Sequence, residues 1–279
     1  MQSKNLYFNG CSFMWGVAHN NSNVFPYFEE TKDIDTSHGL HWNGQTLFSN
    51  YDWVRQKLNI SGRIKEHYGI NIVDESIYGG SLQRVVRKTY NWIFNNKELA
   101  KDTLFILEWP IGARNEMYIP IQKRYVNYTS NFQNFDNIDP YLHRLLINEY
   151  APNFYADGIM FLEDLQSFIG LLHYIKSINA KCLVIMDEYI NDDIVGKDCL
   201  KYIGSQTLKQ LFETEILPHI IEFKFDDNTT TKSMVEYINE SNATFTKDTN
   251  NAYQDDHNSI RGSKIIASQI IDNIQKHGY

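Results

Sequence analysis

Cysteine is scarce in this chain, which has only 3 cysteines among its 279 residues: Cys11, Cys182 and Cys199. An odd number of cysteines without a Cys-x-x-Cys spacing fits neither a disulfide framework nor a zinc site. We therefore expect these side chains to be reduced thiols.

Long apolar runs and clusters of positive charge are also missing. No apolar run is long enough to cross a bilayer, and no signal-peptide-like apolar segment follows Met1. The formal net charge is −8 and no run of Lys or Arg exceeds two residues, which argues against a nucleic-acid partner. We expect a soluble, cytoplasmic protein that binds neither nucleic acid nor membranes. No feature of the sequence predicts its oligomeric state.

The chain does contain a regular alternation of short apolar runs and longer stretches with helical spacing. The apolar runs cover residues 6–8, 70–73, 103–109, 182–186 and 220–225. Apolar residues at helical spacing occupy residues 53–68, 82–94, 161–178 and 208–216. A last helix, with Ile266, Ile270 and Ile274 on one face, is predicted after a capping Asn258 or Ser259. This alternation predicts a three-layer α/β fold: a doubly wound, mostly parallel, five-stranded sheet flanked by helices, as in flavodoxin-like proteins.

Two polar and aromatic stretches interrupt the alternation, at about residues 19–50 and 113–154. Both are too long for ordinary connections, and neither has the Pro/Gly-rich composition of a boundary. We interpret them as insertions on a single domain that covers residues 1–279. The second is rich in tyrosine. It is expected to form either a small satellite core or subunit contact, or an aromatic wall for carbohydrate or acyl groups.

Residues that follow the predicted strands are the first candidates for a site, because ligands bind beyond the carboxyl ends of parallel strands. Ser12 follows the first strand, after a Gly10 that permits a tight turn. A serine nucleophile needs a histidine to take its proton and usually a carboxylate to orient that histidine. His257 lies directly before the last helix, beside Asp255 and Asp256. The alternative is that His257 is a surface residue and that the two aspartates favour the helix N-terminus.

A second acidic group follows the fourth predicted strand. It comprises Asp187-Glu188 and Asp192-Asp193. Clustered oxygen ligands suit Mg²⁺ or Ca²⁺, but the spacing of an EF-hand loop is absent. We interpret this group as a solvated acidic loop.

Three short motifs resemble sequence blocks of the SGNH/GDSL hydrolases. Gly10-Cys11-Ser12, followed by Phe13-x-Trp15-Gly16, is similar to the first block, with Cys11 in place of the usual Asp. Gly79-Gly80-Ser81 is similar to the second block, and Asp255-x-His257 is similar to the last. The motifs occur in the family's order and span nearly the whole chain.

The resemblance implies a site with Ser12 as nucleophile, His257 as general base and Asp255 as the orienting carboxylate. Backbone N–H groups of Ser12 and Gly80 would bind the oxyanion. Many members place the acid three residues before the histidine, where this chain has Gln254, so Asp256 is the alternative acid. No metal and no organic cofactor are implied.

The third block departs from the family's usual Gly-x-Asn-Asp. Residues 108–116 of this chain read Glu-Trp-Pro-Ile-Gly-Ala-Arg-Asn-Glu, so no asparagine lies at the strand end. Asn115 is the candidate third oxyanion donor, reaching the site from the following loop. Loss of one donor lowers an enzyme's rate by about 10²-fold or more. Trp15, Trp109 and Arg114 are the candidate substrate-binding residues.

These residues predict a serine esterase that hydrolyses a carboxylic ester, including O-acetyl groups on a carbohydrate, so the expected partner is a small-molecule or glycan ester. Two alternatives stay open. An acyltransferase of the same fold would pass the acyl group to a glycan hydroxyl instead of water. A binding or structural module would keep the fold with little or no turnover.

Overall fold

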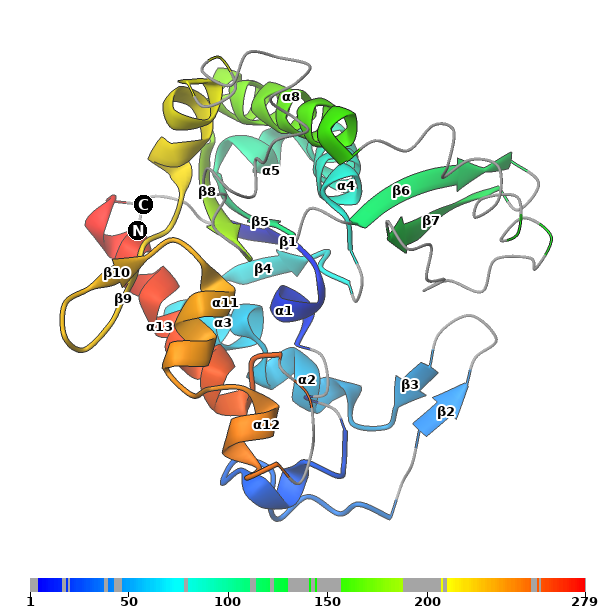
Figure 1. Ribbon diagram of the computed structural model, residues 1–279, viewed down its shortest axis with the longest axis vertical. Helices are drawn as coiled ribbons and strands as arrows, with labels where there is room; N and C mark the ends of the chain where they lie inside the picture. The colour runs from blue at the N-terminus through cyan, green and yellow to red at the C-terminus, as the bar shows by residue number, and fades with distance from the viewer. Residues whose placement is uncertain are drawn as a thin grey trace.

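Four parallel strands form the central sheet of the computed structural model (Figure 1). In order across the sheet they are β4 (Asn71–Asp74), β1 (Asn5–Asn9), β5 (Thr103–Trp109) and β8 (Lys181–Met186). The structure describes residues 5–16, 19, 21–37, 40–42, 47–77, 80–110, 114–120, 123–129, 141, 144, 157–187, 207, 210–251, 255 and 257–278. The pairings β1–β4, β1–β5 and β5–β8 are all parallel, which confirms the predicted α/β class.

Alternating side chains of the strands build a core on each face of the sheet. In β1, Leu6 and Phe8 lie in one core and Tyr7 lies in the other, and all three are 0% exposed. α3 (Ile60–Tyr68) and α13 (Ile260–Lys276) cover the first face, and α4 (Leu82–Asn95) and α8 (Asp157–Ser177) cover the second (Figure 1). Because helices cover both faces, all seven residues of β5 are buried.

Side-chain caps fix where the helices begin. The Ser259 hydroxyl accepts a hydrogen bond of 3.0 Å from the Gly262 N–H at the start of α13, as predicted. The Asn59 side chain caps α3 in the same way. This cap divides the predicted helix of residues 53–68 into α2 (Asp52–Leu58) and α3.

The expected fifth strand at residues 220–225 is reduced to a bridge beside β8. Ile220 pairs in parallel with Val184, and the Ile221 N–H donates to the Val184 carbonyl at 2.9 Å. The chain then leaves the sheet, because β9 (Phe223–Lys224) pairs with the antiparallel β10 (Thr230–Thr231) instead. In place of the second half of the predicted helix at 208–216, the chain forms a π-helix, η4 (Phe212–Ile216). A 3₁₀ turn, η5 (Leu217–His219), follows it.

Part of the first predicted insertion, residues 24–34, packs as a small satellite core. The insertion contains η1 (Phe25–Tyr27), β2 (Leu40–Trp42) and β3 (Leu47–Ser49). Val24, Phe25 and Phe28 are buried against residues of α2 and against Phe245. The described residues also form the short helices α1 (Ser12–Trp15), α5 (Lys97–Lys101), α11 (Met234–Glu240) and α12 (Phe245–Asp248).

The second predicted insertion contains an antiparallel hairpin of β6 (Arg114–Ile119) and β7 (Arg124–Thr129), which extends to one side of the sheet (Figure 1). Arg87 of α4 donates two hydrogen bonds of 2.7 and 2.6 Å to the Glu116 carboxylate. Its guanidinium also lies over the Tyr125 ring, 3.8 Å from the centroid. These contacts fasten the hairpin to the helix layer. Among the described residues, no helix is both long and apolar enough to cross a membrane.

We expect Asp164→Asn to raise thermal stability above pH 7 and to leave it almost unchanged near pH 4. Burial raises the pKa of Asp164 from 3.8 to about 7, although a hydrogen bond with Gln83 lowers it. Because the folded-state pKa is raised, wild-type stability is lost as pH rises from about 4 to about 7, where the buried carboxyl ionises. The amide carries no charge, so the Tm difference between variant and wild type should grow over this window to ~5 °C.

Thermal denaturation at about pH 4, 6 and 8 measures this difference. Asp33→Asn, a substitution at an exposed aspartate, is the matched control and should leave Tm nearly constant at each pH. A Tm difference for Asp164→Asn that does not grow with pH would contradict the prediction.

Candidate active site

The turn that follows β1 lies at the carboxyl edge of the parallel sheet, where ligands bind in this class of fold. β1 ends at Asn9, Gly10 and Cys11 form the turn, and α1 begins at Ser12. A Cβ on Gly10 would overlap the Glu108 carboxylate and lie 2.7 Å from the Glu108 Cβ. The turn therefore packs directly onto β5, which only glycine allows at this point. The Ser12 backbone is described, whereas its side chain lies outside the described part.

The predicted base and carboxylate are in direct contact. His257 Nδ1 lies 2.7 Å from Asp255 Oδ1, and the same oxygen accepts the His257 backbone N–H at 2.9 Å. The Thr246 hydroxyl accepts the Asp255 backbone N–H at 2.8 Å and fixes the loop. Burial raises the pKa of Asp255, but the hydrogen bonds from the His257 ring and backbone outweigh it and hold the pKa below its ordinary value. Asp255 is therefore ionised at neutral pH.

An aromatic contact joins this loop to the turn after β1. The Phe13 ring packs on the His257 imidazole, with centroids 4.7 Å apart and planes tilted by 40°. Phe13 directly follows Ser12 in the chain. The fold thus places the backbone that carries Ser12 beside the His257 ring, although nearly the whole sequence separates them.

The predicted oxyanion donor Gly80 lies against the same turn. A Cβ on Gly80 would be 2.8 Å from the Gly10 carbonyl and 3.4 Å from the Cys11 Cα. The Ile77 N–H donates to the Gly10 carbonyl at 3.2 Å, and the Gly80 N–H donates to the Ile77 carbonyl at 3.3 Å. The absence of a side chain at Gly80 thus allows the segment after β4 to approach the backbone next to Ser12. Gly79 lies outside the described residues.

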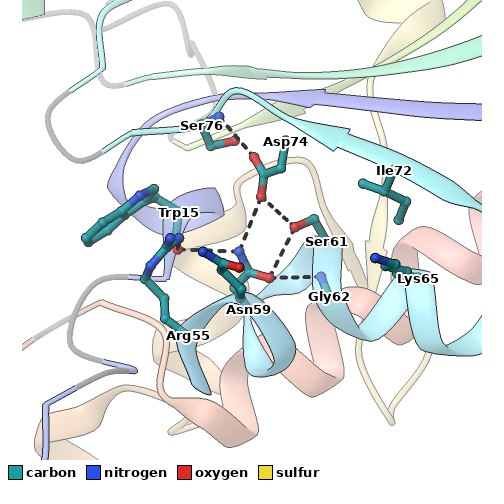
Figure 2. A pocket seen from close by; sticks show the side chains of 10 residues that line it. Trp15, Arg55, Asn59, Ser61, Gly62, Lys65, Ile72, Asp74 and Ser76 are labelled. Atoms are coloured by element: carbon teal, nitrogen blue, oxygen red, sulfur yellow. Dashed lines mark hydrogen bonds between the residues drawn. The ribbon is translucent and has the colours of Figure 1, made fainter. Parts of the chain in front are cut away.

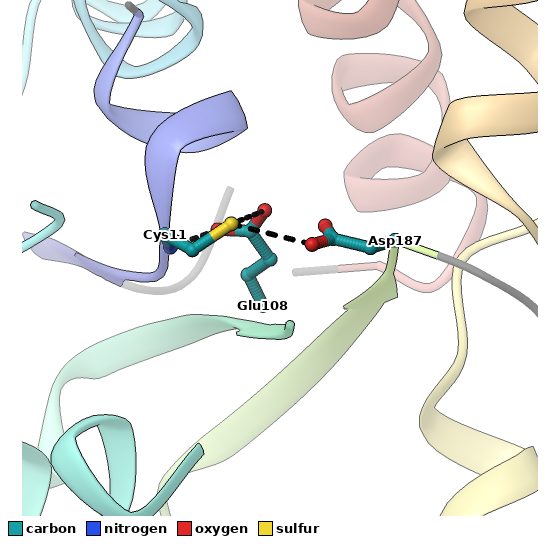
Figure 3. A group of neighbouring side chains, drawn as sticks. All are labelled: Cys11, Glu108 and Asp187. Carbon is teal, nitrogen blue, oxygen red and sulfur yellow. Dashed lines mark hydrogen bonds between the residues drawn. The ribbon is translucent and has the colours of Figure 1, made fainter. Parts of the chain in front are cut away.

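Cys11 of this turn forms a buried group with the side chains of Glu108 and Asp187 (Figure 3). Cys11 Sγ is 3.1 Å from Glu108 Oε1 and 3.2 Å from Asp187 Oδ2, and the Cys11 backbone N–H donates to the Glu108 carboxylate. All three residues are 0% exposed. Burial, and then the negative charge of Asp187, raise the pKa of Glu108 well above its ordinary value. We interpret this group as a hydrogen-bonded brace that holds the turn in place.

The brace also has the composition of a metal site, since one sulfur and two carboxylate ligand atoms lie within 4.8 Å of one another. The three side chains are already bonded to one another, and the Cys11 N–H occupies the Glu108 carboxylate. This donor set therefore fits a hydrogen-bonded group better than an ion-binding cage.

No pattern in the sequence predicted this brace. The expected solvated acidic loop was wrong at Asp187, which directly follows β8, is buried, and contacts the Cys11 sulfur through its carboxylate. Glu108 is the one position where the sequence indicates a buried polar group, since it is the only charged residue in the apolar run of β5. A charge within a fully buried strand requires a nearby partner.

The remaining candidate residues have different positions. Trp109 is 4% exposed and packs against Phe168 and Phe212 in the core, so it is a structural residue rather than a surface for substrate. Trp15 is half-buried at the end of α1 and lines a pocket. The backbones of Arg114 and Asn115 begin β6, whereas their side chains lie outside the described part. Asp256, the alternative acid, also lies outside it.

No protein-family model matches this chain, and no curated protein matches its sequence. Solved structures to which this chain is similar include the psychrotrophic esterase EstA from Pseudoalteromonas sp., with 10% identity and a TM-score of 0.44 over 98% of this chain and 97% of that one. They also include a member of the lipolytic protein G-D-S-L family from Veillonella parvula, with 10% identity and a TM-score of 0.42 over 96% of each chain.

Proposed function

We propose that this chain is a serine esterase of the SGNH type, which hydrolyses a carboxylic ester through an acyl-Ser12 intermediate. The observation that carries the proposal is the contact of His257 with Asp255 at 2.7 Å, together with the packing of His257 on Phe13, the neighbour of Ser12. A histidine held by an ionised carboxylate beside a serine at a strand end has the parts of a nucleophile and its base.

In the proposed reaction, Asp255 accepts a hydrogen bond from the Nδ1–H group of His257, which keeps its proton, and the unprotonated Nε2 takes the proton from the Ser12 hydroxyl. Ser12 Oγ then bonds to the ester carbonyl carbon. The tetrahedral intermediate collapses when the imidazolium returns its proton to the leaving alcohol, which breaks the bond from the carbonyl carbon to the alkoxy oxygen. Water, deprotonated by the same histidine, attacks the acyl group and releases the carboxylic acid and Ser12.

The oxyanion of both tetrahedral intermediates would be bound by the backbone N–H groups of Ser12 and Gly80. The Gly80 N–H donates to the Ile77 carbonyl over a long 3.3 Å, a weak hydrogen bond that a substrate oxyanion would replace. Asn115 remains the proposed third donor. For the substrate we propose an ester of a short acyl group, an O-acetyl group on a carbohydrate being the leading candidate.

Release of p-nitrophenol from p-nitrophenyl acetate tests the proposal. Wild type should turn over repeatedly, and Ser12→Ala should lose nearly all of this activity because no acyl-enzyme can form. Ser177→Ala, at an exposed serine near the end of α8, is the matched control and should retain wild-type activity. Equal, slow release by wild type and Ser12→Ala would refute the esterase proposal and favour a binding module.

A further inference from the structure

The peptide unit that joins Gly10 to Cys11, which we call the anchored peptide, directly precedes the peptide unit that carries the Ser12 N–H. The N–H of the anchored peptide donates to the Glu108 carboxyl group, and its carbonyl accepts from the Ile77 N–H at 3.2 Å. In the next unit, the Cys11 carbonyl accepts a backbone hydrogen bond of 3.0 Å from the last residue of α1. The direction of the Ser12 N–H is therefore set by the bonds of two consecutive peptide planes, which are joined by only two soft dihedral angles.

The end of β4 fixes the segment that holds the carbonyl of the anchored peptide (Figure 2). The Asp74 carboxylate accepts from the Ser61 hydroxyl of α3 at 2.5 Å and from the Ser76 backbone N–H at 2.9 Å. Ile77 follows directly, and its carbonyl accepts from the Gly80 N–H at 3.3 Å. The segment with the second proposed oxyanion donor is therefore linked to the anchored peptide through Ile77.

Glu108 of β5 holds the N–H of the anchored peptide, and its carboxyl group is completely buried (Figure 3). Burial, together with the charge and the hydrogen bond of Asp187, raises the pKa of Glu108 well above its ordinary value. Glu108 therefore keeps its proton at pH values where an exposed glutamate has lost it. A protonated carboxyl group offers one donor, for Asp187, and one acceptor, for the Cys11 N–H, and a glutamine side chain offers the same two kinds of group.

Because Glu108 has no exposed surface, it can act on a substrate only through the turn that it holds. A backbone N–H stabilises an oxyanion only when it points to the oxygen, and a misplacement of about 1 Å costs ~10²-fold in rate. We propose that Glu108 is a positioning residue, whose carboxyl group, by accepting the Cys11 N–H, holds the Ser12 N–H in the direction that binds the oxyanion. The proposal rests on the proposed function, from which the oxyanion role of this N–H is taken.

Two substitutions at Glu108 separate the reach of the side chain from its acidity. Glu108→Gln keeps the length, the acceptor for the Cys11 N–H and a donor for Asp187, so kcat for p-nitrophenyl acetate should stay within about 3-fold of wild type. Glu108→Asp keeps the acid but is shorter by one C–C bond, ~1.5 Å, which withdraws the acceptor from the Cys11 N–H. It should lower kcat by about 10²-fold and change KM by less than about 2-fold, because the misplaced N–H binds the transition state rather than the substrate.

Hydrogen–deuterium exchange of the peptide that contains residues 10–13 measures the hold on the turn without any turnover. Glu108→Asp should speed this exchange by about 10-fold or more and leave the exchange of α13 unchanged, whereas Glu108→Gln should exchange like wild type. Thr103→Val is the matched control, because Thr103 is buried at the other end of β5, where its hydroxyl donates to the Leu99 carbonyl at 2.7 Å. This control removes a hydrogen bond from the same strand and should change neither kcat nor the exchange of the turn.

The proposal is overturned if the turn of Glu108→Asp exchanges like that of wild type, or if it exchanges faster while kcat is unchanged. It is also overturned if Glu108→Gln, which keeps the acceptor, loses kcat by about 10-fold or more. A wild type that does not hydrolyse the ester, with a turn that exchanges faster in Glu108→Asp, would refute the esterase proposal and support the hold of Glu108 on the turn. Failure of the esterase proposal and failure of the positioning role are therefore distinguishable.

Discussion

Replacing His257 with alanine should lower kcat/KM for p-nitrophenyl acetate by about 10³- to 10⁴-fold, and combining it with Ser12→Ala should cost no more than either change alone. The reason is that the two side chains act in one step: without the base Ser12 keeps its proton, and without Ser12 the base has nothing to deprotonate. Steady-state kinetics on the two single variants and the double variant measure this non-additivity.

Two further variants sharpen this test. Asp255→Asn should lower kcat/KM by about 10²-fold or more, because an amide no longer stabilises the imidazolium and can select the wrong tautomer. His173→Ala is the matched control: His173 is an exposed histidine that is also 2.7 Å from a carboxylate, that of Glu215, but it lies on α8. His257 would not be the partner of Ser12 if the two single-variant losses in kcat/KM multiplied in the double variant. The same conclusion would follow if His173→Ala lost as much kcat/KM as His257→Ala.

The second large effect is expected from Gly10→Ala, which should destabilise the fold by about 3 kcal/mol or more and lower Tm by ~8 °C. The new Cβ would overlap the Glu108 carboxylate and lie 2.9 Å from the Met14 Cγ. Glu108 cannot move aside cheaply, because it is buried on the central strand and its carboxylate accepts the Cys11 N–H. The turn that carries Ser12 would therefore have to shift, and esterase activity should fall with stability.

Thermal or urea denaturation measures this effect, with Gly170→Ala as the matched control. Gly170 is exposed within α8, and the nearest atom to an added Cβ is the Tyr90 hydroxyl at 3.6 Å. Alanine there should stabilise the helix by ~0.5–1 kcal/mol, because it restricts the unfolded chain. If Gly10→Ala were as stable as wild type, the close packing of the turn on β5 would be wrong.

The sequence pattern predicts those parts of the fold that depend on local periodicity. The continuous apolar run of β1 and the isoleucine stripe of α13 are visible in single segments, because a strand covered on both faces is apolar throughout and a helix buries about every fourth residue on one face. The cap at Asn59 and the departure of β9 from the sheet were not predicted. Both depend on competing hydrogen bonds, to the N–H groups of α3 and to β10, that an apolar pattern does not record.

In the candidate site, too, only the contact between residues close in the sequence could be predicted. Asp255 and His257 are two residues apart, so their contact follows from a short loop before a helix. The brace joins Cys11, Glu108 and Asp187, from the ends of three strands, and only the strand order β1–β5–β8 brings them together. The charge of Glu108 in a buried strand predicts that a partner is near, but it does not identify Cys11 and Asp187 as the partners.

The most direct test of the account is the position of the adduct formed with a fluorophosphonate probe, mapped by mass spectrometry of peptides from the wild-type chain. A fluorophosphonate phosphonylates an activated serine, so the account predicts one adduct, on Ser12, that disappears in His257→Ala. The neighbouring Cys11 should stay unmodified, because its sulfur is buried between Glu108 and Asp187. An adduct on another residue, or no adduct while p-nitrophenyl acetate is still hydrolysed, would contradict the assignment of Ser12 as the nucleophile.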